Sequence, residues 1–233
     1  GCCYEGIGLI ISSDLEWDNQ VIDVLGLSWN NGLSATAVHR DEHTLQQYLD
    51  VLRRAEVVIG QNYLDADCRQ LAKEDIDVSW LEPKVWDVRL AAHAISGHLA
   101  GTGSYDLRSL VLLFGSRQGQ RFVSDWKFYE TDLHKTCALD AAAAGWLYPT
   151  LKRQIEHNKL QATLTISHKT APIFSRMHEQ GVRLDKQALE QIYTARKEKT
   201  DHIIEKYGLW EERGKKVIKK VPIWRSDKIL DIF

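Results

Sequence analysis

Two acidic residues separated by a single residue, Asp14 and Glu16, follow the first apolar stretch of the sequence, at residues 7–12. If that stretch is a β-strand, side chains at positions i and i+2 project from the same face, so the two carboxylates lie side by side. Their mutual repulsion is costly at the end of a buried strand unless a cation neutralises it. Hard carboxylate oxygens suit Mg²⁺ or Mn²⁺. The pair therefore indicates a divalent metal site, with a solvated strand end as the alternative.

Two further acids, Asp67 and Asp140, occupy positions where a carboxylate requires an explanation. Asp67 follows a second short apolar stretch, at residues 57–60. Asp140 lies in an apolar helical stretch directly before four alanines, and small residues let a helix lie close against a sheet. A charge in so apolar a helix is costly without a partner. We therefore take both acids as candidate metal ligands; the alternative for Asp140 is a position that faces solvent.

The elements that must position these acids alternate between strands and helices in the first half of the chain. The residues Asn30-Asn31-Gly32 predict a hairpin turn. A hairpin followed by alternating helices and strands predicts an α/β fold, with helices packed on a mixed sheet. Hydrophobic periodicity predicts strands at 7–12, 21–29, 35–39 and 57–60, and helices at 41–55, 65–74, 88–95, 105–114 and 133–155.

Charge is distributed unevenly along the chain, although the net charge is only −2. Residues 1–150 carry 12 basic and 21 acidic side chains, a net charge of −9, whereas residues 151–233 carry 18 basic and 11 acidic ones, a net charge of +7. A basic second part indicates a polyanionic partner. The composition, 44% hydrophobic and 27% charged, is that of a globular protein and excludes disordered and fibrous classes.

The sequence contains no signal for export or membrane insertion. Asp14 and Glu16 interrupt the longest early apolar run, far short of the roughly 18 residues of a membrane span. The first residues do not show a basic region that leads into an apolar one. The four cysteines are too scattered for a disulfide framework or a zinc ribbon, which is typical of reduced intracellular thiols. We expect a cytoplasmic protein with no membrane partner.

The order of the four acids resembles that of the DEDD exonucleases of ribonuclease-H-like fold, and more closely the proofreading domain of family A DNA polymerases. Gly60-Gln61-Asn62 followed by Asp67 is similar to the second motif of that family, and residues 86–93 (WDVRLAAH) are similar to its DTRLAAH helix. Residues 171–185 (APIFSRMHEQGVRLD) resemble the segment that opens the polymerase portion. The resemblance covers most of the chain and implies a ribonuclease-H-like mixed sheet flanked by helices.

This resemblance implies a two-metal-ion 3′→5′ exonuclease that uses Mg²⁺ or Mn²⁺. Asp14, Glu16 and Asp140 would bind the first ion; Asp14 would bridge to the second, which Asp67 would hold through water. The implied reaction hydrolyses the 3′-terminal phosphodiester of single-stranded DNA and releases a nucleoside 5′-monophosphate. The substrate-binding residues that the resemblance implies are Leu15, Trp17 and Asn62.

Two positions depart from the family's pattern. Thr136 stands four residues before Asp140, where the family has a tyrosine whose hydroxyl positions the attacking water. A threonine hydroxyl reaches less far, so we expect Thr136 to position the water more weakly or differently. Trp17 stands where a threonine commonly follows the acid pair. Its ring either stacks on the terminal base or packs against a neighbouring helix.

We predict two parts, an exonuclease domain over residues 1–157 and the start of a polymerase thumb-like helical region over 158–233. The second part is predicted to contain helices at 166–180 and 186–207 and a basic hairpin at 214–224. It is too short for the polymerase catalytic motifs, so we expect the remainder of a DNA polymerase chain as a partner and no polymerase activity in these residues. The alternative functions are a catalytically weakened exonuclease fold kept for DNA binding or structure, and an RNA 3′-end trimmer of the same superfamily.

Overall fold

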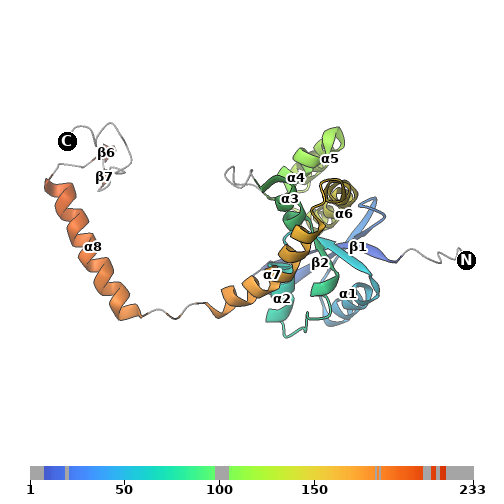
Figure 1. Ribbon diagram of the computed structural model, residues 1–233, viewed down its shortest axis with the longest axis horizontal. Coiled ribbons are helices and arrows are strands. Elements are labelled where there is room, and N and C mark those ends of the chain that lie inside the picture. The colour runs from blue at the N-terminus through green and yellow to red at the C-terminus, as the bar shows by residue number, and fades with distance from the viewer. Residues whose placement is uncertain are drawn as a thin grey trace, which may run out of the picture. The chain divides into compact units, whose positions relative to one another are not determined.

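The computed structural model describes residues 8–18, 21–97, 105–181, 183, 185–206, 211–213 and 216–218. The chain divides into two compact units, Gly1–Gln180 and Gly181–Phe233. The first unit is built around a β-sheet and carries every candidate site residue that the sequence analysis names (Figure 1).

A five-stranded mixed sheet forms the centre of the first unit. Its antiparallel part contains β1 (Ile10–Asp18), β2 (Val21–Trp29) and β3 (Ser34–His39). The strands β4 (Val57–Gly60) and β5 (Val85–Asp87) continue the sheet in parallel beside β1, in the order β3-β2-β1-β4-β5. This confirms the predicted α/β fold with a mixed sheet flanked by helices, an arrangement consistent with a ribonuclease-H-like fold.

The predicted hairpin turn between β2 and β3 is confirmed. Asn30 and Asn31 have φ angles of 55° and 54°, and Gly32 has a φ of 81°. Asparagine and glycine adopt this left-handed conformation at the least cost, which is why they dominate tight hairpin turns. The amide of Leu33 closes the turn by donating to the carbonyl of Asn30 at 3.2 Å.

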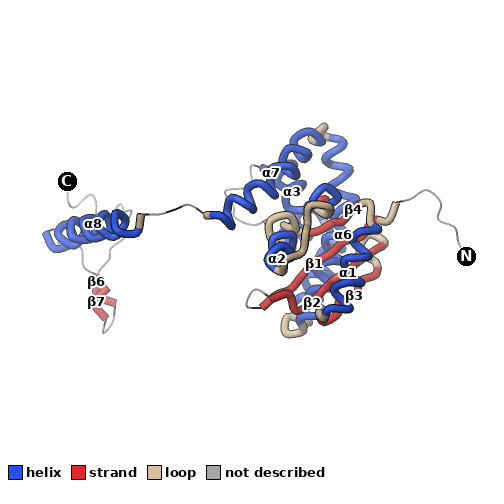
Figure 2. Tube along the Cα trace, turned by 90° about the horizontal axis from the view of Figure 1, so that it is seen from below, coloured by secondary structure: helices blue, strands red, loops and turns tan. Residues whose placement is uncertain are grey.

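Helices cover both faces of the sheet because its central strands are apolar on both sides. Consecutive strand residues point to opposite faces. Val58 joins a core cluster with α1 (Glu42–Arg54) and α2 (Asp67–Lys73). Ile59 joins a second cluster with α3 (Val88–Ser96), α4 (Leu107–Phe114) and α6 (Leu133–His157). Figure 2 shows the strands side by side with helices packed around them. The predicted helices are thus confirmed, with ends displaced by a few residues.

Aspartates at the N-caps fix where these helices begin. Asp41 and Thr44 form a capping box at α1, in which each side chain bonds the backbone amide of the other at 2.7 and 2.8 Å. The side chains of Asp87, Asp106 and Asp132 accept backbone amides at the starts of α3, α4 and α6. Satisfying these otherwise unpaired donors stabilises a helix by about 1 kcal/mol at each cap.

Small residues let α6 lie directly against the sheet, as the alanine run predicted. Ala141 to Ala144 and Gly145 are all buried. A Cβ atom added at Gly145 would collide with the Ser12 hydroxyl of β1. A Cβ added at Gly26 of β2 would lie 2.7 Å from the Cys137 sulfur of α6. The helix can therefore bring its polar residues to the sheet at very short range.

Three elements of the first unit were not predicted from the sequence: the 3₁₀ helix η1 (Glu82–Lys84), the strand β5 and one α-helix. The strand β5 is only three residues long, too short to show an alternating pattern. The helix α5 (Ser116–Phe128) begins with a polar first turn and contains Gly119, which lowers helix propensity. Its apolar face is narrow and rests mainly on Phe122 and Trp126.

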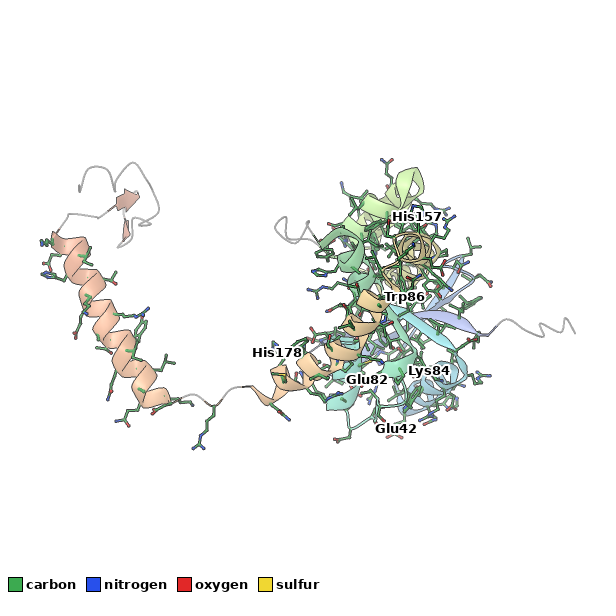
Figure 3. The ribbon with its side chains drawn as sticks, in the orientation of Figure 1. Glu42, Glu82, Lys84, Trp86, His157 and His178 are labelled. Atoms are coloured by element: carbon green, nitrogen blue, oxygen red, sulfur yellow. The ribbon has the colours of Figure 1, made fainter. Side chains whose placement is uncertain are left out.

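The helix α7 (Gln161–Gln180) belongs to the first unit, beyond the predicted domain end at residue 157. His168 on α7 accepts a hydrogen bond from the Asp87 amide at 3.1 Å. Arg176 pairs at 3.0 Å with Glu82 in the short 3₁₀ helix η1 (Glu82–Lys84). Figure 3 shows Glu82 and Trp86 beside α7. These contacts carry the compact unit to Gln180.

The second unit contains α8 (Lys186–Lys206) and an antiparallel strand pair, β6 (Glu211–Arg213) and β7 (Lys216–Ile218). The helix confirms the prediction over 186–206. Of the predicted basic hairpin at 214–224, only the residues of β7 are described, and residues 214–215 and 219–224 lie outside the described residues. Among the helices that the structure describes, none combines the length and apolar character needed to cross a membrane.

Replacing Gly145 with valine is expected to destabilise the first unit by about 1–3 kcal/mol, because the new side chain forces α6 away from β1. The matched control is Gly97→Ala: a Cβ at Gly97 meets no atom within 4 Å, so its effect should stay within about 0.5 kcal/mol. Urea unfolding followed by circular dichroism measures both variants. Equal unfolding midpoints for Gly145→Val and the unaltered chain would contradict the close approach of α6.

The free energy of unfolding of the first unit should fall in mildly acidic solution, because protonation of the half-buried His168 ring favours the unfolded chain. Burial lowers the pKa of His168 to about 4, so the folded chain keeps the ring neutral while the unfolded chain protonates it near pH 6.5. The stabilisation is complete above pH 6.5 and is lost as the pH falls towards 4, by about 1 kcal/mol at pH 5 for this partly exposed ring.

The variant His168→Gln keeps an acceptor for the Asp87 amide but does not titrate. Its free energy of unfolding should therefore change less between pH 7 and pH 5 than that of the unaltered chain. The buried acids contribute with the opposite sign, so the difference between the two proteins isolates His168. Parallel pH dependences in urea unfolding would rule out this role.

Candidate metal centre

The strand β1 presents two carboxylates on one face, as the sequence predicts. Asp14 and Glu16 alternate with Leu15, whose side chain is buried in the core on the other face. The strand β4 pairs with β1 only along Ile10–Ser12, so β1 continues beyond the end of its parallel neighbour. The acids therefore lie within β1 rather than after it, at the edge where the parallel strands end.

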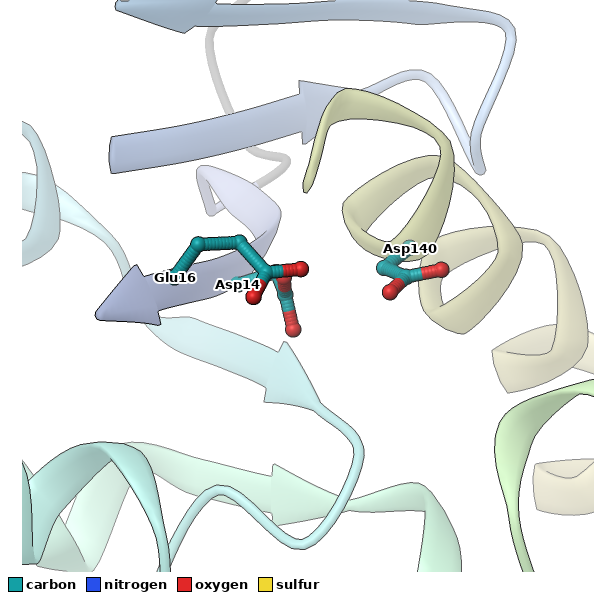
Figure 4. Close-up of side chains that lie close together, drawn as sticks. All are labelled: Asp14, Glu16 and Asp140. Carbon is teal, nitrogen blue, oxygen red and sulfur yellow. The ribbon is translucent and has the colours of Figure 1, made fainter. Parts of the chain in front are cut away.

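The helix α6 supplies the third carboxylate. It lies against β1 and β2 through its small residues, and the Cys137 thiol donates to the main-chain carbonyl of Asp14 at 3.5 Å. One turn further along, Asp140 faces the two acids of β1 (Figure 4). Carboxylate oxygens of Asp14, Glu16 and Asp140 lie within 4.8 Å of one another. Three hard oxygen donors at this range can hold a divalent metal ion.

Burial and mutual repulsion disfavour the charged forms of these acids. Burial raises the pKa of Asp14 well above its usual range, and the charges of Asp67, Asp140 and Glu16 raise it further. Burial raises the pKa of Asp140 to about 7, against the opposing effect of a hydrogen bond from Trp126. Burial also raises the pKa of Glu16. A bound cation would relieve both costs, because it stabilises the charged carboxylates.

The fourth predicted ligand, Asp67, lies beside these three acids rather than among them. It is the first residue of α2 and is only 3% exposed. Its Oδ1 accepts a hydrogen bond from the Leu15 amide at 3.0 Å. Because its charge raises the pKa of Asp14, Asp67 belongs to the electrostatic neighbourhood of the site. The structure brings three of the four acids together and ties the fourth to the backbone between the first two.

A buried carboxylate that the sequence analysis did not single out, Asp87, organises the loop that leads to Asp67. It accepts the amides of Asn62 and Leu64 at 3.1 and 3.3 Å, from the loop after β4. It also accepts the amides of Arg89 and Leu90 at 2.9 and 3.2 Å, from the start of α3. Its position directly before a predicted helix is the N-cap signal that could have identified it.

Asn62, in the loop after β4, lines a cleft whose lining residues do not include the three acids. Its backbone φ is 59°, and its side-chain oxygen accepts a hydrogen bond from the Arg89 guanidinium at 2.7 Å. The cleft has a volume of about 450 Å³ and is also lined by His93, Tyr105 and Phe174. Aromatic rings and a cation in one cleft are the groups that bind bases and phosphates of single-stranded nucleic acids.

The remaining predicted residues take different positions. The Thr136 hydroxyl donates to the main-chain carbonyl of Tyr129 at 3.1 Å, so this hydroxyl is engaged by the segment before α6. Trp17 follows a register shift in β1 and is 40% exposed, which leaves its ring available to solvent. The side chain of Leu15 packs in the core, and only its amide reaches the site, through Asp67.

No family model matches the chain, and no curated protein matches it.

Binding of Mn²⁺ or Mg²⁺ should release protons near neutral pH, because burial raises the pKa of Asp140 to about 7 in the metal-free site and raises the pKa of Asp14 as well. A protonated carboxyl group is a poor ligand, so the affinity should weaken as the pH falls below about 7. Titration calorimetry with Mn²⁺ in two buffers of different ionisation enthalpy counts the protons. An affinity that is unchanged between pH 8 and pH 6 would contradict this coupling.

Proposed function

We propose that this chain is a divalent-metal-dependent 3′→5′ exonuclease of the proofreading type, part of a family A DNA polymerase. Its substrate would be the 3′ end of single-stranded DNA and its product a nucleoside 5′-monophosphate. The observation that carries the proposal is the convergence of Asp140 with Asp14 and Glu16, which lie in a distant part of the sequence, to within 4.8 Å. The strand polarity, the preference for DNA and the polymerase partner come from the sequence resemblance.

The donor set fits Mg²⁺ or Mn²⁺, because it consists of carboxylate oxygens without thiolate or imidazole ligands. Asp14, Glu16 and Asp140 would hold the first ion, and Asp67 would contribute to a second from beside them. When bound, two such ions activate a water molecule and stabilise the charge that develops on the scissile phosphate.

The protein's own residues would bind and orient the DNA strand. The Arg89 guanidinium, held by Asn62, would contact a phosphate in the cleft, and the aromatic side chains of Tyr105 and Phe174, which also line it, would stack on bases. The exposed ring of Trp17 is available to stack on the terminal base. The Asp67 hydrogen bond to Leu15 fixes the loop after β4 against β1, so the strand would meet acids whose positions are already set.

A weakened, DNA-binding role is the second candidate function, and the hydrogen bond of Thr136 favours it. A hydroxyl that donates to the Tyr129 carbonyl is less free to position a water molecule. Titration calorimetry separates the two functions, since a structural module would show no saturable Mn²⁺ binding.

A cytoplasmic location is part of the main proposal, because Cys68 and Cys137 are free thiols.

The test of the proposed function follows a 5′-labelled single-stranded DNA incubated with the full chain and Mg²⁺ or Mn²⁺. We expect a ladder that shortens from the 3′ end. The variant Glu16→Gln should lower the rate at least about 100-fold, because it removes a charged ligand. The control Glu42→Gln changes an exposed glutamate of α1 in the same way and should leave the rate unchanged.

Three results would contradict the proposal. They are products from the 5′ end, activity that persists in the metal chelator EDTA, and equal rates for Glu16→Gln and Glu42→Gln. A 5′-labelled RNA strand of the same sequence serves as the comparison, and faster trimming of RNA would favour the RNA 3′-end trimmer instead.

A further inference from the structure

Trp126 on α5 links that helix directly to the candidate metal centre. Its side chain is 1% exposed, so its indole N–H needs a partner inside the protein. That partner is Asp140: Nε1 donates to Oδ1 at 2.6 Å. A donor at this distance from a carboxylate forms a charge-assisted hydrogen bond.

This hydrogen bond fixes the orientation of the Asp140 carboxyl group. The bond uses part of the capacity of one oxygen and holds the group against rotation, while Asp140 still offers an oxygen to the cluster with Asp14 and Glu16. The N–H also favours the ionised form of Asp140, the form that binds metal, against the effects of burial and of Glu16.

The indole is itself held from the solvent side by Arg108 on α4. The guanidinium carbon of Arg108 lies 5.7 Å from the centroid of the Trp126 ring, within the range of a cation–π interaction. The charge of Arg108 also favours ionised Asp140. Phe122 packs on the same indole, with ring centroids 5.9 Å apart. The contacts with Arg108 and Phe122 therefore hold the indole ring in place independently of its hydrogen bond to Asp140.

We propose that Trp126 is a positioning residue for the metal ligand Asp140 and that Arg108 holds the indole in place. This inference rests on the proposed function, because it assigns Trp126 to the same metal centre. Residues that orient a metal ligand through a hydrogen bond typically contribute about 10–100-fold to metal affinity or activity. Such a residue acts on the affinity for metal and on the rate of hydrolysis, and leaves the binding of the DNA strand unchanged.

The experiment replaces only the N–H. In the full chain, Trp126 is substituted by benzothienylalanine, in which sulfur takes the place of the indole N–H while the ring keeps its shape. Mn²⁺ binding, followed by the electron paramagnetic resonance of free Mn²⁺, should weaken about 10–100-fold. With single-stranded DNA at low Mn²⁺, kcat should fall while KM changes less than about twofold. Raising the Mn²⁺ concentration should restore kcat, because the lost function is affinity for metal.

Two genetic variants extend the test. Trp126→Phe also lacks the N–H and should reproduce the effect of the analogue, while Trp146→Phe is the matched control. Trp146 packs on the same Phe122, at 5.4 Å between ring centroids, but lies outside the acidic cluster. The Mn²⁺ affinity of the Trp146→Phe variant should therefore match that of the unaltered chain. Arg108→Gln changes an exposed residue and should weaken Mn²⁺ binding by about threefold.

The outcomes separate this inference from the proposed function. If the unaltered chain binds Mn²⁺ and the benzothienylalanine protein binds it equally well, the role of Trp126 is overturned and the exonuclease proposal stands. If the unaltered chain shows no saturable Mn²⁺ binding, the proposed metal centre is overturned as well. A loss of affinity in Trp146→Phe equal to that in Trp126→Phe would show a general packing effect and would also overturn the inference.

Discussion

The repulsion among half-buried carboxylates is the constraint on which the arrangement of the first unit depends. Asp14 and Glu16 project from β1 at the point where the parallel pairing with β4 has ended, and α6 brings Asp140 against them. That approach is possible because Gly145 and the neighbouring alanines leave almost no space between α6 and the sheet. The fold thus uses the favourable burial of small apolar residues to hold together charges that oppose one another.

Much of this arrangement is predictable because it follows from local patterns. The period-two placement of Asp14 and Glu16 indicates a shared face, and the alanines after Asp140 indicate a helix close to a sheet. The turn at 30–32 is specified by residues that tolerate a positive φ. These features together are sufficient for the α/β class and for the three carboxylates that converge.

The parts that the sequence did not predict depend on contacts between distant segments. The helix α5 has a narrow apolar face, so the contact of Trp126 with Asp140 has no local signal. The bond from Leu15 to Asp67 joins a strand to a helix start and leaves no periodic trace. The Thr136 hydroxyl donates to the carbonyl of Tyr129, a residue outside α6, and no local pattern of the sequence indicates this bond.

The hydrogen bond between the Asp87 amide and His168 connects α7 to the residue that holds the loop after β4. The backbone amide of Asp87 donates a hydrogen bond to His168 on α7. The carboxylate of Asp87 accepts the amide of Asn62, in the loop that leads to Asp67. Because α7 is the last helix of the first unit, the position of that helix and the conformation of the loop beside the acids depend on the same residue, Asp87. The geometry around Asp67 is therefore linked, through Asp87, to the position of α7.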